Sequence, residues 1–190
     1  MNHELDELHK LLTFGVAYEE TPRGLRFPSE NLMAVGEWEI YRNGALDEVV
    51  SNLVVTQGRD YLLSAGFKGA TAITTWYVAL FSGDVTPQAT WTAANFATQA
   101  TEFVNYEEGS RPAWTSGSVS AGVLDSYASR AAFTISENSQ TVRGAALLST
   151  SAKQGTSGTL YAAARFTNAK TLDSDETIDI GYRVSLVTPT

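Results

Sequence analysis

The last strand-like stretch of the chain shows a strict alternation of apolar and polar side chains. In ETIDIGYRVSLV, apolar residues occupy every second position from 178 to 186: Ile178, Ile180, Tyr182, Val184 and Leu186. A β-strand points successive side chains to opposite faces of its sheet, so this pattern demands one buried face. We expect Ile178, Ile180 and Val184 in the core, whereas Tyr182 can keep its hydroxyl in water.

Earlier stretches show the same period and are separated by turn-forming clusters such as ENSQ, KQGTSG and LDSDE. Residues 131–135 alternate, residues 160–166 place Leu160, Ala162, Ala164 and Phe166 on one face, and Gly144 indicates a bulge in a further strand. Short strands at such spacing are typical of all-β domains. We therefore predict a mainly β chain that folds as an antiparallel two-sheet sandwich of jelly-roll type.

We place the start of this sandwich domain near Gly36, so that it covers 36–190. Trp38 and Ile40 alternate with glutamates, and Asn43-Gly44 predicts a tight hairpin turn, because both residues tolerate positive φ. A return strand is expected at 46–50.

One or two short helices and a buried strand follow. Thr56 is expected to cap a helix at 56–65, with Gly66 ending it. Two interpretations stay open for the segment at 93–100: a second short helix capped by Thr92, or a long loop. Residues 76–81 are apolar without alternation, which predicts a central strand covered on both faces.

Residues 1–35 differ from the sandwich domain and are interpreted as an N-terminal arm. A short amphipathic helix is predicted at 2–12, and prolines and glycines follow it among large apolar residues. Such residues left in water would form a patch that monomers avoid. The arm is expected either to pack on its own domain or to reach a neighbouring subunit or a capsid. The candidate interface residues are Leu8, Leu11, Phe14, Tyr18, Phe27 and Met33, and a chain that begins at Gly36 should fold but lose oligomerisation or particle binding.

Charge and composition exclude several classes of function. The chain has 13 basic and 21 acidic residues and a net charge of -8, which argues against binding to nucleic acid or to an anionic membrane. It has no cysteine, which excludes disulfides and thiolate chemistry. The N-terminal MNHELDELHKLL lacks the order of a signal peptide, so we expect a protein made in a cytoplasm.

Catalytic and metal-binding patterns are weak, and we expect neither an enzyme nor a cofactor. His3 and His9 are six residues apart, which suits no helical metal pair. The neighbours Glu107 and Glu108 would point to opposite faces of a strand, so a glycosidase would need a second acid such as Asp125, and a polar loop with a surface Arg111 is favoured. The acidic turn 173–176 lacks the spacing of a calcium loop.

The four tryptophans allow a carbohydrate-binding alternative. Trp38 and Trp76 lie inside strand patterns and are expected in the core, whereas Trp91 and Trp114 lie in loop-like segments and would be the sugar platforms.

Five stretches together resemble a known group of proteins: NLVVTQGRDYLL (52–63), TTWYVALFSGDVTP (74–87), NYEEGSRPAW (105–114), SRAAFTI (129–135) and GTLYAAARF (158–166). The sequences of these stretches and their order along the chain resemble those of small virion structural proteins of tailed bacteriophages, of the head decoration or cement type. The resemblance covers about residues 36–187 and leaves the arm outside.

The resemblance implies a β-rich, non-enzymatic virion protein that forms homo-oligomers and stabilises the phage head. Its partners would be the major capsid protein or other virion proteins, on a particle assembled in the host cytoplasm. A tail or head–tail connector component, or a carbohydrate-binding receptor-recognition module, stays an alternative.

Overall fold

The computed structural model describes residues 19–21, 24–26 and 33–187, with side chains from Met33 onward. The chain divides into two units, and residues 34–186 form the sandwich domain. The expected helix at 2–12 lies outside the described residues. In the other unit, β1 (Glu19–Thr21) and β2 (Gly24–Arg26) pair as a small antiparallel hairpin.

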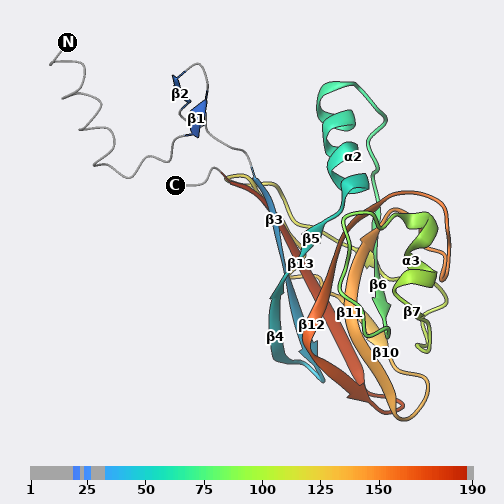
Figure 1. The fold of residues 1–190 in the computed structure, drawn as a ribbon. Coiled ribbons are helices and arrows are strands. Elements are labelled where there is room, and N and C mark those ends of the chain that lie inside the picture. Colours follow the sequence, from blue (N-terminus) through green and yellow to red (C-terminus); the bar gives the residue numbers. More distant parts are fainter. Residues whose placement is uncertain (1–18, 22–23, 27–32, 188–190) are drawn as a thin grey trace, which may run out of the picture. The chain divides into compact units, whose positions relative to one another are not determined.

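The sandwich domain consists of two antiparallel sheets, which confirms the predicted mainly β two-sheet sandwich (Figure 1). Jelly-roll connectivity stays a prediction. The first sheet has the order β10-β13-β3-β4, with β9 also pairing with β13. Its strands are β3 (Met33–Arg42), β4 (Ala45–Ser51), β9 (Val123–Asp125), β10 (Ala131–Thr134) and β13 (Thr177–Val187).

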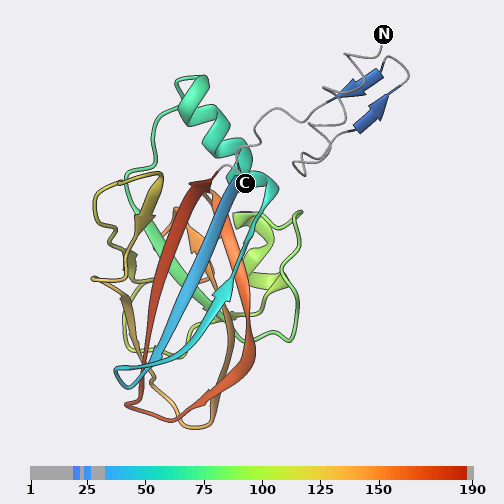
Figure 2. The same ribbon diagram turned by 90° about the vertical axis from the view of Figure 1, so that its left-hand side faces the viewer.

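The second sheet has the order β5-β12-β11-β6-β7, with β8 also pairing with β6. Its strands are β5 (Leu53–Val54), β6 (Trp76–Phe81), β7 (Glu102–Phe103), β8 (Ala113–Trp114), β11 (Gln140–Leu148) and β12 (Leu160–Leu172). Two helices accompany the sheets: α2 (Thr56–Phe67) stands at one end of the domain, and α3 (Ala93–Gln99) lies against the second sheet (Figures 1 and 2).

The first hairpin forms where its turn residues predict it. Asn43 and Gly44 both have positive φ, 47° and 80°, between β3 and β4. This turn lies at the end of the sandwich opposite α2 (Figure 1). β3 starts at Met33, three residues before the expected start of the domain, so a chain cut at Gly36 would lose the beginning of this strand.

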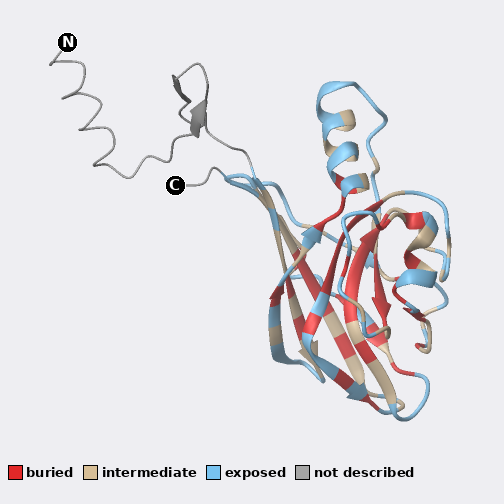
Figure 3. Ribbon diagram, in the orientation of Figure 1, coloured by how far each residue is buried: buried red, intermediate tan, exposed pale blue. Residues whose placement is uncertain are grey.

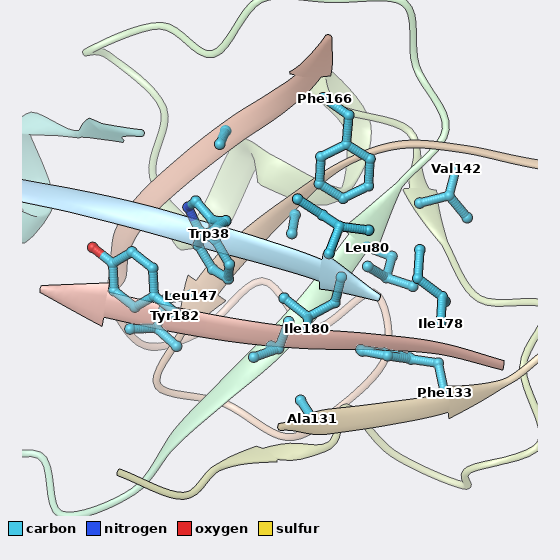
Figure 4. Close-up of a cluster of buried hydrophobic side chains, with 14 of the residues drawn as sticks. Trp38, Leu80, Ala131, Phe133, Val142, Leu147, Phe166, Ile178, Ile180 and Tyr182 are labelled. Carbon is cyan, nitrogen blue, oxygen red and sulfur yellow. The ribbon is translucent and has the colours of Figure 1, made fainter. Parts of the chain in front are cut away.

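The main core lies between the two sheets, and the first sheet supplies it by strict alternation. Trp38, Ile40, Phe133, Ile178 and Ile180 are fully buried, which confirms the predicted register (Figures 3 and 4). Tyr182 also faces inward, with its ring centroid 4.2 Å from that of Trp38. Its hydroxyl accepts a hydrogen bond from Asn52 Nδ2 at 2.9 Å, so this polar group is satisfied without water.

A second core covers the outer face of the second sheet. Ala79 and Phe81 of β6 pack there against Phe96 of α3, while Val78 and Leu80 face the main core. This confirms the prediction of a central strand covered on both faces. α3 begins as predicted: the backbone of Asn95 donates to the Thr92 side chain, and Asn95 Oδ1 accepts from the Thr92 backbone at 2.8 Å.

The predicted ends of α2 are wrong by one or two residues. Val55 is the N-cap, and its carbonyl accepts the first helical bond from the Arg59 backbone. Thr56 is already helical, and its Oγ1 accepts from the Arg59 side chain at 3.0 Å instead of capping. The helix continues through Gly66 to Phe67, because the Lys68 backbone still bonds to Ser64 O.

Two irregularities in the second sheet change which residues face the core. Gly144 marks the predicted bulge, and a Cβ there would lie 2.4 Å from the Ala164 carbonyl oxygen. A second register shift occurs where Leu147 pairs with Ala162 but Leu148 pairs with Leu160, so Tyr161 is the extra residue. The prediction that Leu160 shares a face with Ala162 is therefore wrong: Leu160 packs in the second core.

Candidate functional site

Most of the predicted interface residues lie in the arm, beyond what the structure describes. Leu8, Leu11, Phe14, Tyr18 and Phe27 are outside the described residues, as are both histidines. Met33 is the first residue of β3, and its side chain is 48% exposed. The arm as an interface therefore stays a prediction.

The carboxylates considered for catalysis are far apart and hold backbone or ion-pair contacts. Glu108 accepts hydrogen bonds from the Thr134 backbone at 3.1 and 3.2 Å, and Asp125 accepts from Arg183. Thr134 pairs with Thr177 of β13 and Asp125 with Arg183. Thr177 and Arg183 are six residues apart on β13, so the partners of Glu108 and Asp125 lie about 20 Å apart along this strand. A glycosidase needs two carboxyl groups within about 10 Å, so this arrangement does not suit one.

Hydrogen bonds within the turn and from two other parts of the chain hold the acidic turn 173–176. Asp173 Oδ1 accepts from the Ser139 backbone at 2.8 Å, and Glu176 accepts from the Asp173 backbone and from Asn43. Hydrogen bonds from these two donors lower the pKa of Glu176 below its usual value. Within the described part of the chain, no group of three or more His, Asp or Glu residues could hold a metal ion.

Arg111 is buried, so its predicted place on the surface is wrong. Its guanidinium donates to both oxygens of Glu102 at 2.8 and 2.7 Å and to the Thr150 carbonyl at 3.0 Å, and both side chains of the ion pair are fully buried. The Gln154 backbone also donates to Glu102, at 2.9 Å. This ion pair ties the segment 102–111 to the segment 150–155.

The predicted sugar platforms are contradicted at Trp91, and the expectation for Trp76 is only half met. Trp91 is 3% exposed and packs edge-on against Phe81 and Phe96 in the second core. Trp114 and Trp76 are both half-buried, and both line one cleft. Because Trp91 is covered, a pair of open aromatic platforms does not exist at these two positions.

The cleft lies at the α2 end of the sandwich and is lined by residues of both sheets. It has a volume of about 240 Å³. One wall comes from the second sheet with Trp76, Trp114 and Tyr161, and the opposite wall from β9 and β13. The β9 and β13 wall consists of Val123, Leu124, Val184 and Leu186, and Leu147 of β11 adds to the wall of the second sheet. The remaining lining comes from Tyr61 and Leu62 of α2 and from Val119 and Gly122 in the loop before β9.

Of the four aromatic side chains in the lining, Trp114 and Tyr61 have their polar atoms in hydrogen bonds with the backbone, and the buried Tyr161 hydroxyl has no partner among the described residues. Trp114 Nε1 donates to the Tyr182 carbonyl at 3.2 Å, and the Tyr61 hydroxyl accepts from the Ile73 backbone at 2.8 Å. Burial raises the pKa of Tyr161 to about 12, so its hydroxyl stays neutral at ordinary pH. The cleft is therefore suited to apolar groups and has no charged side chain in its lining.

α2 is fixed at its base and exposes apolar side chains beyond it. Gln57 Oε1 accepts from the backbones of Ala93 and Leu160 at 2.9 and 2.8 Å. A Cβ on Gly58 would lie 2.2 Å from the Tyr161 carbonyl oxygen, so the helix can approach β12 closely only with glycine there. Tyr61 and Leu62 face the cleft. On the other side of the helix, Leu63 is 59% and Phe67 is 85% exposed.

We name Leu63 and Phe67 the outer face of α2. Leu63 lies within the helix predicted at 56–65, but nothing in the sequence pattern marked it as a functional residue. Its exposure follows from how the helix is set on the sandwich, since adjacent positions such as Leu62 and Leu63 can both lie in the apolar stripe of a helix. Val119, at the rim of the cleft, is 70% exposed and was also missed.

Neither helix in the described part of the chain is long and apolar enough to cross a membrane. Comparison with models of known protein families gives no match, and a search of curated proteins finds no similar chain.

Proposed function

We propose that this chain is a non-enzymatic structural protein of a tailed-phage particle, a head decoration protein that stabilises the shell by burying apolar surface against it. The resemblance of residues 36–187 to such proteins suggests the particle. The observation that carries the proposal is the outer face of α2, where Leu63 and Phe67 lie four residues apart and exposed at one end of the domain. Large side chains on one helix face in water mark a protein interaction site.

The remaining features of the domain suit a rigid part that works by contact. Gln57 and Gly58 hold the base of α2 to β12, so the outer face is presented on a fixed helix. Burying both side chains would contribute about 1.5–3 kcal/mol each, before the cost of ordering. Repetition of such a small contact over many copies stabilises a shell without one tight site.

The test is binding to phage particles that lack this protein. Full-length wild type and a Leu63→Asp/Phe67→Asp variant are each mixed with the particles, and the bound fraction is measured by sedimentation. We expect the variant to bind at least tenfold more weakly, because two buried carboxylates in an apolar contact cost more than the 1.4 kcal/mol that a tenfold change represents.

Leu46→Asp is the matched control. Leu46 is 53% exposed but lies beside the turn at the opposite end of the domain, so this variant should bind like wild type. Equal binding of all three proteins would contradict the proposed role of α2. The copy number in purified particles separates the head from the tail: a number comparable with that of the major capsid protein supports decoration, and a few copies would indicate a tail or connector component.

A further inference from the structure

The cleft at the α2 end is a surface distinct from the outer face of α2, and it is open in the sandwich domain. The lining of the cleft includes four aromatic residues and no charged group. The volume of the cleft is about that of one or two bulky side chains. We propose that the cleft binds residues 14–18 of the arm of a second copy of this chain.

The chemistry of this arm segment matches the lining. Phe14, Val16 and Tyr18 occur at every second residue, so an extended chain places all three on one side. Thr13, Gly15 and Ala17 then fall on the other side, where small or polar groups can face water. Aromatic rings pack favourably edge-to-face, and Tyr61, Trp76 and Trp114 provide ring surface for Phe14 and Tyr18.

The length of the arm limits how far this segment can reach. Glu19 pairs with Arg26 in the β1–β2 hairpin, so the start of β1 lies beside the end of β2. From Arg26 to Met33 the chain takes 33 − 26 = 7 steps, which span at most about 25 Å. A copy in direct contact can therefore receive the segment if its cleft lies within about this distance of Met33.

The choice of a second copy, instead of the same chain, rests on the proposed function, in which the protein acts as an assembly. The cleft itself and the matching segment do not depend on it. In such an arm exchange, each copy would insert its arm into one neighbour and receive the arm of another. These head-to-tail contacts close into a ring or extend into a network of subunits.

The absence of cysteine allows a direct test in the full-length protein. Three versions carry one cysteine each in the arm, as Thr13→Cys, Gly15→Cys or Ala17→Cys, and also a mass tag. An untagged partner carries Val119→Cys at the cleft rim, where the side chain is exposed. Each pair is mixed at micromolar concentration under mild oxidation, and disulfide-linked species are resolved by mass.

If the proposal is right, at least one tagged version forms a disulfide with the Val119→Cys chain. Docking holds the thiols at a millimolar effective concentration, so the bond should form roughly 100-fold faster than with a Leu46→Cys partner. Adding Phe14→Asp to the reactive version should abolish this excess, while binding of both chains to particles is measured separately.

Two results would overturn the proposal. A single chain carrying both the reactive arm cysteine and Val119→Cys could close an internal disulfide while mixed chains do not link, which would show that the arm returns to its own domain. Formation no faster than the Leu46→Cys control, in either arrangement and at all three positions, would show that the cleft does not bind this segment. The outer face of α2 would still be judged by particle binding alone, so failure of one proposal leaves the other testable.

Discussion

The buried ion pair between Glu102 and Arg111 allows a quantitative prediction about stability. Replacing Arg111 with Met leaves the Glu102 carboxylate inside the domain with the Gln154 backbone as its remaining partner, and leaves the Thr150 carbonyl without its donor. Removing one member of a buried pair costs about 3–5 kcal/mol. For a domain of this size, that cost corresponds to a fall in Tm of about 6–20 °C.

The measurement is urea unfolding of the wild type, of Arg111→Met and of a double variant Arg111→Met/Glu102→Leu, followed by tryptophan fluorescence. We expect the double variant to be more stable than Arg111→Met, because it no longer buries an unpaired charge. Asp84→Asn is the matched control: Asp84 pairs with Arg165 at the surface, where both side chains are largely exposed, so its loss should cost less than about 1 kcal/mol.

Two results would refute this reasoning. If Arg111→Met and Asp84→Asn lost similar stability, the buried position of the ion pair would not matter. If the double variant were the least stable of the three, the ion pair would be worth more than its desolvation cost.

Three further predictions concern local structure and pH. Gly58→Ala should destabilise the domain by about 1–3 kcal/mol in thermal unfolding, although alanine favours helices, because the new methyl group meets the Tyr161 carbonyl; a gain in Tm would contradict the close approach. Thr92→Ala should cost about 1 kcal/mol through loss of the capping box, and Thr92→Ser should recover most of it. Burial alone would raise the pKa of Glu48, but hydrogen bonds from Lys170 and from the Thr167 backbone outweigh it and hold this pKa below the ordinary value of a glutamate. The stability that Glu48 contributes is therefore complete above that value and lost as the pH falls through the lowered pKa, so Glu48→Gln should unfold with a shallower acid dependence than wild type.

The features predicted well from the sequence are those that neighbouring residues determine. The alternation around Ile178 and Ile180, the Asn43-Gly44 turn and the capping of α3 by Thr92 each depend on a few consecutive residues, and the structure confirms all three. The apolar run of β6 indicated burial on both faces, because a strand that faces water on one side cannot be apolar at every position.

The errors arise where distant segments decide the environment. Arg111 is charged and follows a polar stretch, so its neighbours in the sequence do not show that it pairs with Glu102 inside the domain. Trp91 lies in a loop, but α3 and the second sheet enclose it. Leu160 changes face because of one extra residue in β12 opposite β11.

The cleft could not be predicted for the same reason. Its lining is contributed by seven parts of the chain that are separated by up to 125 residues, from Tyr61 to Leu186. The outer face of α2 could not be predicted either, because its exposure follows from how Gly58 sets the helix on β12.

A cryo-EM map of the intact particle tests the central claim most directly, because it shows where the sandwich domain sits and which surface it uses. The account predicts this domain on the outside of the head, in copies that follow the capsid lattice, with Leu63 and Phe67 of α2 against the shell. Density for the domain only in the tail, or on the head with the outer face of α2 turned to solvent, would contradict it.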